Sequence, residues 1–213
     1  MRKKFEQLAQ DILALHKPDH AGKVEIAKIL CEKGHANRHQ KFSREPAANH
    51  PKRVGELARK AFLEAGDENN ARLAELAGIC HDLLEKTAIP AETIAKALGT
   101  DVCALAGQLV NQFSKKRFPH EPRATRKYHE AQRLSELPAI AQSIKLCDII
   151  DNLSNLEKAA KTNKEWADGY LKEQEEIITL LTDAIPNLRQ LANKTLEGAK
   201  KLQLTSPETS SEA

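Results

Sequence analysis

The chain has 213 residues, of which 30% are charged and 40% belong to the hydrophobic set, and its mean hydropathy is −0.55. This length can bury a real core and this composition is that of a globular protein, which excludes fibrous and wholly disordered classes. The formal net charge of +3 is small and few aromatic residues lie among the basic ones, so no surface for duplex nucleic acid is expected.

Cysteine usage and the start of the chain indicate the compartment. Cys31, Cys80, Cys103 and Cys147 show no close-spaced pairing, and no secretory apolar region opens the chain. All apolar runs are too short to cross a bilayer. We therefore expect reduced thiols, a cytoplasmic protein and no membrane span.

Helical periodicity runs through the first part of the chain. Helices are expected over about Lys3–His16 and Ala21–Lys33, followed by an irregular polar stretch that ends at Asn49. Pro51 suits a first helical turn, where its missing N–H is no loss, so a helix should begin around His50 and continue through Phe62.

The later segments are also helical. The stretch Leu73–Glu85 is apolar and favours helix, Ala91–Leu98 begins after a proline and is closed by Gly99, and Ile144–Leu153 is a third helical stretch. Alternating apolar patterns are nearly absent, so the expected fold class is all-α, an irregular multi-helix bundle. We expect one domain over residues 1–204, with a core of about 35–156 and helical extensions at both ends, and a disordered tail over 205–213.

Ionisable residues interrupt two of the apolar stretches. His81 and Asp82 lie in the first, where Glu85 follows His81 by four positions and shares its helix face. Asp148 lies in the second, with Asn152 four positions later and Lys145 one turn before. An unpaired carboxylate in such a context is costly, and a divalent cation shared with His50 would compensate both segments.

The residues leave alternatives open. A histidine on an apolar face is commonly a hydrogen-bonded core residue, and Asp148 could pair with Lys145. The conjunction of His50 before a proline, the His81-Asp82 pair and Asp148 favours a metal site. Mixed nitrogen and oxygen donors suit manganese, iron or zinc better than magnesium alone, and Glu85 could orient a water.

A basic stretch lies between the two apolar ones. It contains Lys115, Lys116, Arg117, Arg123, Arg126 and Lys127 and is either a phosphate-binding surface or a solvated basic face. The remaining histidines lie in polar contexts and are expected at the surface: His16, His20, His35, His39, His120 and His129.

These segments resemble the HD superfamily of metal-dependent phosphohydrolases, and more narrowly the hydrolase domain of RelA/SpoT-type alarmone enzymes and their small stand-alone relatives. The resemblance covers roughly residues 35–156 and rests on Asn49-His50-Pro51, His81-Asp82 with its continuation to Thr87, residues 97–102, and Ile144 through Leu153. It implies an HD-type helical domain and a Mn²⁺ ion held by His50, His81, Asp82 and Asp148.

The same resemblance implies roles for other residues. Glu85 would assist the attacking water and Asn152 would complete the site, while Arg123, Arg126 and Lys127 would contact phosphate. Lys86 stands where the family has an aspartate and could stabilise phosphate charge. The segment Arg38 to Lys41 stands where the family has an Arg-Lys pair, with Ala47 in place of a tyrosine. Lys41 and Lys145 complete the expected substrate-binding set.

Three functions follow as hypotheses. The first is hydrolysis of a phosphorylated nucleotide, most specifically removal of 3′-pyrophosphate from an alarmone such as guanosine 3′,5′-bis(diphosphate). The second is a nucleotide or dinucleotide phosphomonoesterase, suggested by the altered pocket. The third is a catalytically silent nucleotide-binding module, suggested by Lys86.

Overall fold

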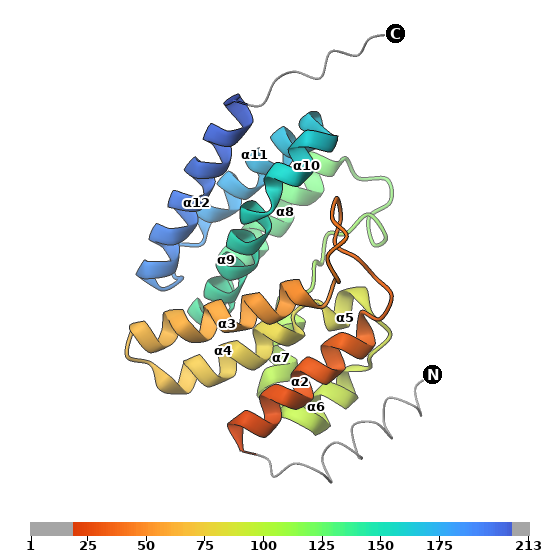
Figure 1. Ribbon diagram of the computed structural model, residues 1–213, viewed down its shortest axis with the longest axis vertical. Helices are drawn as coiled ribbons and strands as arrows, with labels where there is room; N and C mark the ends of the chain where they lie inside the picture. Colours follow the sequence, from red (N-terminus) through yellow and green to blue (C-terminus); the bar gives the residue numbers. More distant parts are fainter. Residues whose placement is uncertain (1–18, 206–213) are drawn as a thin grey trace.

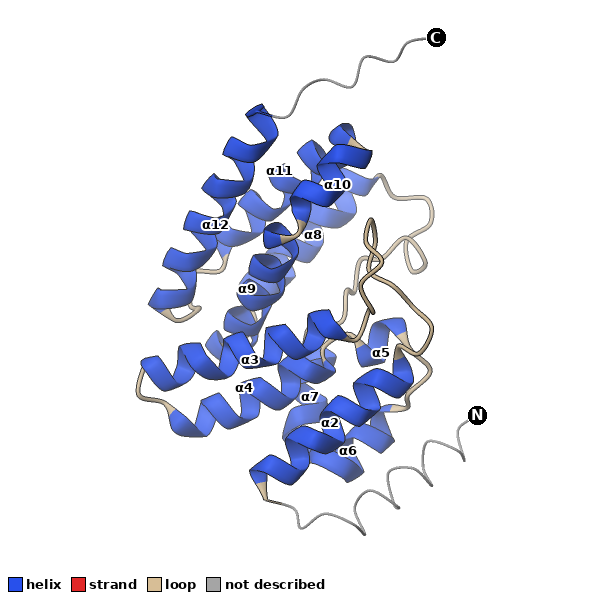
Figure 2. Cartoon of the chain, in the orientation of Figure 1, coloured by secondary structure: helices blue, strands red, loops and turns tan. Residues whose placement is uncertain are grey.

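The computed structural model describes residues 19–205, and these form helices α2 to α12 without a strand. The all-α prediction is therefore confirmed (Figures 1 and 2). The predicted helix Lys3–His16 and nearly all of the predicted tail lie outside the described residues. The helices are α2 (His20–Gly34), α3 (Asn49–Glu64), α4 (Glu68–Cys80), α5 (Leu83–Lys86), α6 (Ala91–Leu98), α7 (Thr100–Gln108), α8 (Arg123–Ser135), α9 (Ala139–Ser154), α10 (Leu156–Thr162), α11 (Lys164–Leu180) and α12 (Pro186–Thr205).

Helix α4 lies at the centre of the bundle because it is apolar on more than one face. Its Ala71, Ala74 and Ala77 belong to a core shared with α3, α9 and the carboxyl-terminal helices. Ile79 and Cys80 belong to a second core shared with α2, α6 and α7. No helix among residues 19–205 has the length and apolar character needed to cross a membrane.

Helices α3 and α4 form an antiparallel hairpin, in which they lie side by side (Figure 1). Gly66, with φ of 78°, makes the turn between them, and the Asp67 side chain caps α4 by accepting the Asn70 N–H at 3.0 Å. The beginning of α3 therefore lies beside the end of α4, and α9 packs against both helices.

The two hairpin helices are in close backbone contact at a pair of glycines. A Cβ on Gly78 would lie 2.8 Å from the Cα of Gly55, and a Cβ on Gly55 would lie 2.6 Å from the carbonyl oxygen of Glu75. Both contacts are with backbone, which cannot move aside as a side chain does. These glycines allow the spacing that brings the two helix ends together.

One local prediction was wrong. His81 and Asp82 were expected inside a continuous helix, but α4 ends at Cys80 and α5 begins at Leu83, so the pair lies in a turn. The His81 ring explains the break, because its Nδ1–H donates to the Gly78 carbonyl at 2.7 Å and competes with the backbone for that acceptor. By contrast, α6 has the predicted bounds.

We predict that Gly55→Ala lowers the free energy of unfolding by about 2 kcal/mol, since the added methyl group must push α3 away from α4. Gly198→Ala is the matched control in α12, where an added Cβ meets nothing within 4 Å. The control should be neutral or up to about 1 kcal/mol more stable, because alanine favours helix. Urea unfolding followed by circular dichroism measures both variants, and equal stability of the two would contradict the close-contact account.

Candidate metal centre and adjoining cavity

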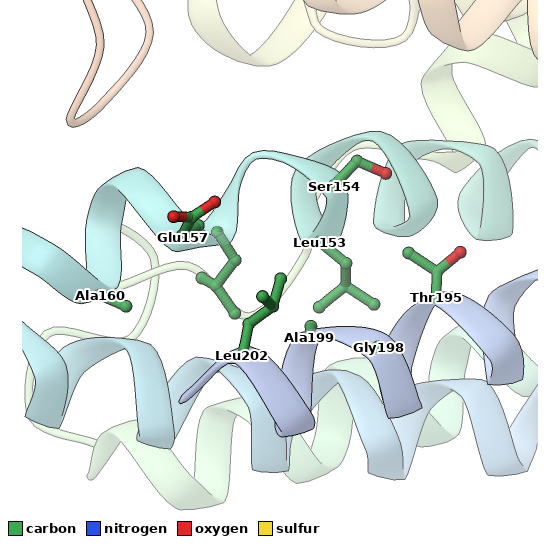
Figure 3. A pocket seen from close by; sticks show the side chains of 9 residues that line it. Leu153, Ser154, Glu157, Ala160, Thr195, Gly198, Ala199 and Leu202 are labelled. Carbon is green, nitrogen blue, oxygen red and sulfur yellow. The ribbon is translucent and has the colours of Figure 1, made fainter. Parts of the chain in front are cut away.

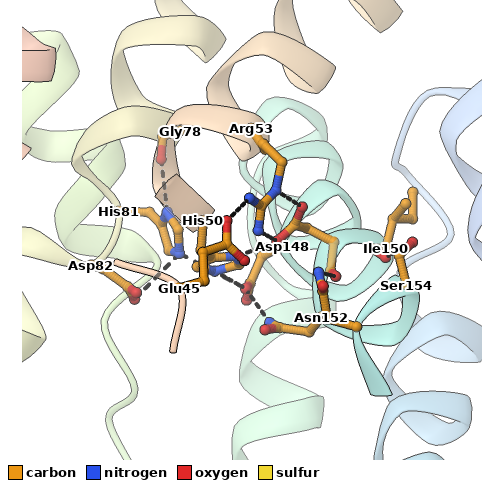
Figure 4. Close-up of polar contacts among 12 residues, drawn as sticks. Glu45, His50, Arg53, Gly78, His81, Asp82, Asp148, Ile150, Asn152 and Ser154 are labelled. Atoms are coloured by element: carbon orange, nitrogen blue, oxygen red, sulfur yellow. Dashed lines mark hydrogen bonds and ion pairs between the residues drawn. The ribbon is translucent and has the colours of Figure 1, made fainter. Parts of the chain in front are cut away.

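His50 lies in the first turn of α3 and is 6% exposed. Its Nδ1 lies 2.7 Å from Asp151 Oδ2. A carboxylate can only accept, so Nδ1 carries the proton and Nε2 of a neutral ring presents a lone pair. That Nε2 lies 3.0 Å from Asp148 Oδ1 without hydrogen-bond geometry (Figure 4).

His81 presents the same nitrogen. Because its Nδ1–H donates to the Gly78 carbonyl, Nε2 is again the unprotonated atom of the neutral ring. This Nε2 lies 3.2 Å from Asp82 Oδ1 and 3.8 Å from Asp148 Oδ1. The rings of His50 and His81 meet edge to face with centroids 5.2 Å apart.

The donor atoms fit a divalent cation. One ligand atom each from His50, His81 and Asp148 lies within 4.8 Å of the others, and all three residues are buried. Neither Nε2 atom has a hydrogen-bond partner in the described part of the chain. Leaving such an atom unsatisfied costs about 1–3 kcal/mol, and a metal ion would satisfy both. Asp82 falls outside this group of three but contacts it through His81.

The charges at the cluster favour a cation. Burial lowers the pKa of His50, but the neighbouring carboxylates of Asp148 and Asp151 outweigh it and raise the pKa to about 9, so the ring is protonated until a metal ion takes the place of the proton on Nε2. Burial raises the pKa of Asp82, but His81 and Lys86 outweigh it and hold the pKa at about 2. The negative field that retains a proton on His50 also attracts a metal ion.

Two lysines orient the two carboxylates. Lys86 Nζ donates to Asp82 Oδ2 at 2.7 Å, and Lys145 Nζ donates to Asp148 Oδ2 at 2.5 Å. In both residues Oδ1 is the oxygen that faces the histidines. Asn152 Nδ2 donates to Asp148 Oδ1 at 2.7 Å. Because burial is outweighed by Lys145 and His50, the pKa of Asp148 lies well below its ordinary value.

Asp151 is a site residue that sequence reasoning missed. Besides accepting from His50, it binds the Arg53 guanidinium, with Nε to Oδ1 at 2.6 Å and Nη2 to Oδ2 at 3.0 Å. Arg53 also pairs with Glu45 (Figure 4). Asp151 follows Asp148 by three positions on α9, and that helical spacing was the signal available in the sequence.

A cavity of about 430 Å³ adjoins the cluster. Three cationic side chains line it, those of Arg38, Lys41 and Lys86, and Asp82 is the one acidic side chain on its wall among the described residues. Its remaining walls are formed by His35, His39, Gln40, Phe42, Ala47, His50, Asn152, Asn155, Leu156, Ala159, Trp166 and Tyr170. The cavity therefore suits an anion with an aromatic or apolar part.

The aromatic wall comes from two distant segments. The Trp166 and Tyr170 rings stack with centroids 5.1 Å apart, and Phe42 tilts against Trp166 at 4.9 Å. The Lys41 ammonium lies 4.1 Å from the Trp166 centroid. Lys41 thus contacts the surface on which a planar base could stack.

Several residues expected at the site lie elsewhere. Glu85 is exposed and its Oε2 accepts the Asn111 N–H at 3.1 Å. Arg123 and Lys127 pair with Glu173, and Arg126 donates to the carbonyls of Glu121 and Phe113. None of these four candidate side chains lines the cavity beside the cluster.

His35 corrects the surface prediction, because it is only 4% exposed. It lies at a closely packed end of α2, because a Cβ on the adjacent Gly34 would lie within 3.2 Å of side-chain atoms of Leu83, Thr87 and Ile89. His39 and His120 are exposed as expected, whereas His16 lies outside the described residues.

A second cavity, of about 220 Å³, lies where α9 and α10 meet α12 (Figure 3). Its walls are mostly aliphatic, with Leu153, Leu156, Ala199 and Leu202, and Glu157 is the one titratable residue on them in the described part of the chain. No metal-ligating set borders it within the described residues. The candidate metal ligands His50 and Asp82 line the first cavity instead.

Comparisons with known proteins identify solved structures with a similar fold. No family model matches the sequence, and no curated protein sequence matches it significantly. A solved structure described as a metazoan ortholog of SpoT that hydrolyses ppGpp and plays a role in starvation responses is similar with a TM-score of 0.68 at 21% identity, covering 83% of this chain and 94% of that one. The structure of lmo0812 from Listeria monocytogenes EGD-e is similar with a TM-score of 0.51 at 18% identity, covering 71% and 94%. The resemblance to the RelA/SpoT-type hydrolase domain is therefore confirmed at the level of the fold.

Proposed function

We propose that this chain is a metal-dependent phosphohydrolase of a phosphorylated nucleotide, most specifically one that removes pyrophosphate from the 3′ position of guanosine 3′,5′-bis(diphosphate). The observation that carries the proposal is the convergence of His50, His81 and Asp148 beside a cavity lined by cationic and aromatic side chains. The fold of a SpoT ortholog described as hydrolysing ppGpp supports it.

His50, His81, Asp82 and Asp148 would hold the ion. Their nitrogen and oxygen donors suit Mn²⁺, and such an ion makes water a stronger nucleophile and polarises a phosphoryl oxygen. Lys145 Nζ donates to Asp148 Oδ2 and so keeps the other oxygen, Oδ1, directed toward the histidines. Asn152 Nδ2 donates to Asp148 Oδ1 and limits rotation of the same carboxylate.

The substrate would occupy the adjoining cavity. Lys86 is bound to Asp82 yet lines the cavity, so its ammonium can also stabilise phosphate charge next to the ion. Arg38 donates to the Lys86 carbonyl and fixes that segment. A base could stack against Trp166 in place of the Lys41 ammonium, which would then turn to a phosphate group.

A silent nucleotide-binding module is the second candidate. Lys86 supplies a cation where the family has an aspartate. Glu85 accepts a hydrogen bond from the Asn111 N–H and does not line the cavity. Both observations reduce the number of carboxylates available as a general base. A phosphomonoesterase differs from both candidates in its product, which would be orthophosphate.

We predict that the manganese-loaded chain releases pyrophosphate from guanosine 3′,5′-bis(diphosphate), and that His81→Ala abolishes both release and tight Mn²⁺ binding by removing one ligand. His120→Ala is the control, because His120 is exposed and lies outside the cavity. Phosphate-resolving chromatography identifies the product, and circular dichroism verifies the fold. Full turnover by His81→Ala would refute the proposal. Binding of the nucleotide by the unmodified chain without any product would favour the silent module.

We also predict that Asp151→Asn weakens Mn²⁺ binding by about 10- to 100-fold, since a carboxylate that orients a ligating histidine contributes that much. Isothermal titration of the metal-free protein with Mn²⁺ measures the affinity. Asp168→Asn removes the same charge from an exposed pair with Lys164 on α11 and should bind Mn²⁺ as the unmodified chain does. Unchanged affinity in Asp151→Asn would show that His50 needs no such partner.

A further inference from the structure

The His35 side chain is buried without a hydrogen-bond partner among residues 19–205. It is 4% exposed, and neither Nδ1 nor Nε2 has a partner in the described part of the chain. A neutral imidazole carries one N–H donor and one lone pair, so both of its polar functions are unsatisfied. Buried polar groups in native proteins are nearly always paired, and this ring therefore requires an explanation.

The other unpartnered imidazole nitrogens at the site are explained by the proposed metal ion. Those of His50 and His81 belong to the donor cluster and would be satisfied by the ion. His35 is not a member of that cluster, so an ion held there leaves its nitrogens unpaired. Its partner must come from another direction.

The adjoining cavity can supply such a partner, because His35 is one of its wall residues. Arg38, Lys41 and Lys86 line the same space, so an anion that enters it would meet three cations together with this ring. Burial lowers the pKa of His35, which keeps the ring neutral near pH 7. A neutral N–H adds a directed hydrogen bond to a phosphoryl oxygen without adding another buried charge.

We propose that His35 is a substrate-contacting residue whose ring N–H donates to a phosphoryl oxygen of the nucleotide in the cavity. This inference rests on the proposed function, because it takes a phosphorylated nucleotide as the ligand. It assigns His35 to binding, separately from the metal ligands.

The test measures ligand affinity and thermal stability in the same variants. His35→Phe keeps a planar aromatic ring, slightly larger than imidazole, but removes both polar atoms, while His35→Gln and His35→Asn each restore an amide donor at a different reach. Guanosine 3′,5′-bis(diphosphate) and inorganic pyrophosphate are titrated calorimetrically into protein held in a chelator, so that turnover plays no part.

We predict that His35→Phe binds the nucleotide at least 10-fold more weakly and has an equal or higher melting temperature, since it relieves an unsatisfied buried group. Either His35→Gln or His35→Asn should recover part of the affinity. Thr93→Val is the matched control: Thr93 Oγ1 is also buried and has no hydrogen-bond partner among the described residues, but it lies on α6 outside the cavity. This control should bind both ligands as the unmodified chain does.

Unchanged affinity in all three His35 variants would overturn the inference while leaving the proposed function intact. A melting temperature lowered in His35→Phe, with affinity retained in His35→Gln and His35→Asn, would assign the ring a structural role and also overturn it. An unmodified chain that binds neither ligand in chelator and releases no pyrophosphate when loaded with Mn²⁺ would instead contradict the proposed function, and the inference with it.

Discussion

The close backbone contact between α3 and α4 at Gly55 and Gly78 positions the rest of the site. Because the two helices are antiparallel, their contact places His50 at the beginning of one beside His81 after the end of the other. Helix α9 packs across both and contributes Asp148. Three segments far apart in sequence thus converge through helix packing, and a change in helix spacing would move two donors at once.

Charge balance is the second constraint, because the cluster buries two carboxylates that remain ionised. Lys86 and Lys145 neutralise Oδ2 of Asp82 and of Asp148. The Oδ1 atoms of the two carboxylates face imidazole nitrogens. A buried ion pair is costly unless its remaining hydrogen-bonding atoms are satisfied. Here the unsatisfied atoms are those that would bind a cation, so the arrangement is better explained by metal binding than by stability of the apoprotein.

The sequence predicted features that depend on local chemistry, such as the helix Ala91–Leu98 between Pro90 and Gly99. It also pointed to His50, His81 and Asp148, because ionisable residues within apolar stretches require partners. It failed where a side chain acts over a long range. Asp151 pairs with His50 101 positions away, His35 is buried at the closely packed end of α2, and the His81 ring donates to the Gly78 carbonyl at the turn that follows α4.

We propose that the junction of α3, α4 and α9 holds one divalent cation. Anomalous diffraction at the manganese edge, from crystals of the metal-loaded chain, tests it directly. We expect one strong peak within coordination distance of His50 Nε2, His81 Nε2 and Asp148 Oδ1. A structure without a peak there, or with His50 still protonated and paired to Asp148 under saturating Mn²⁺, would contradict it.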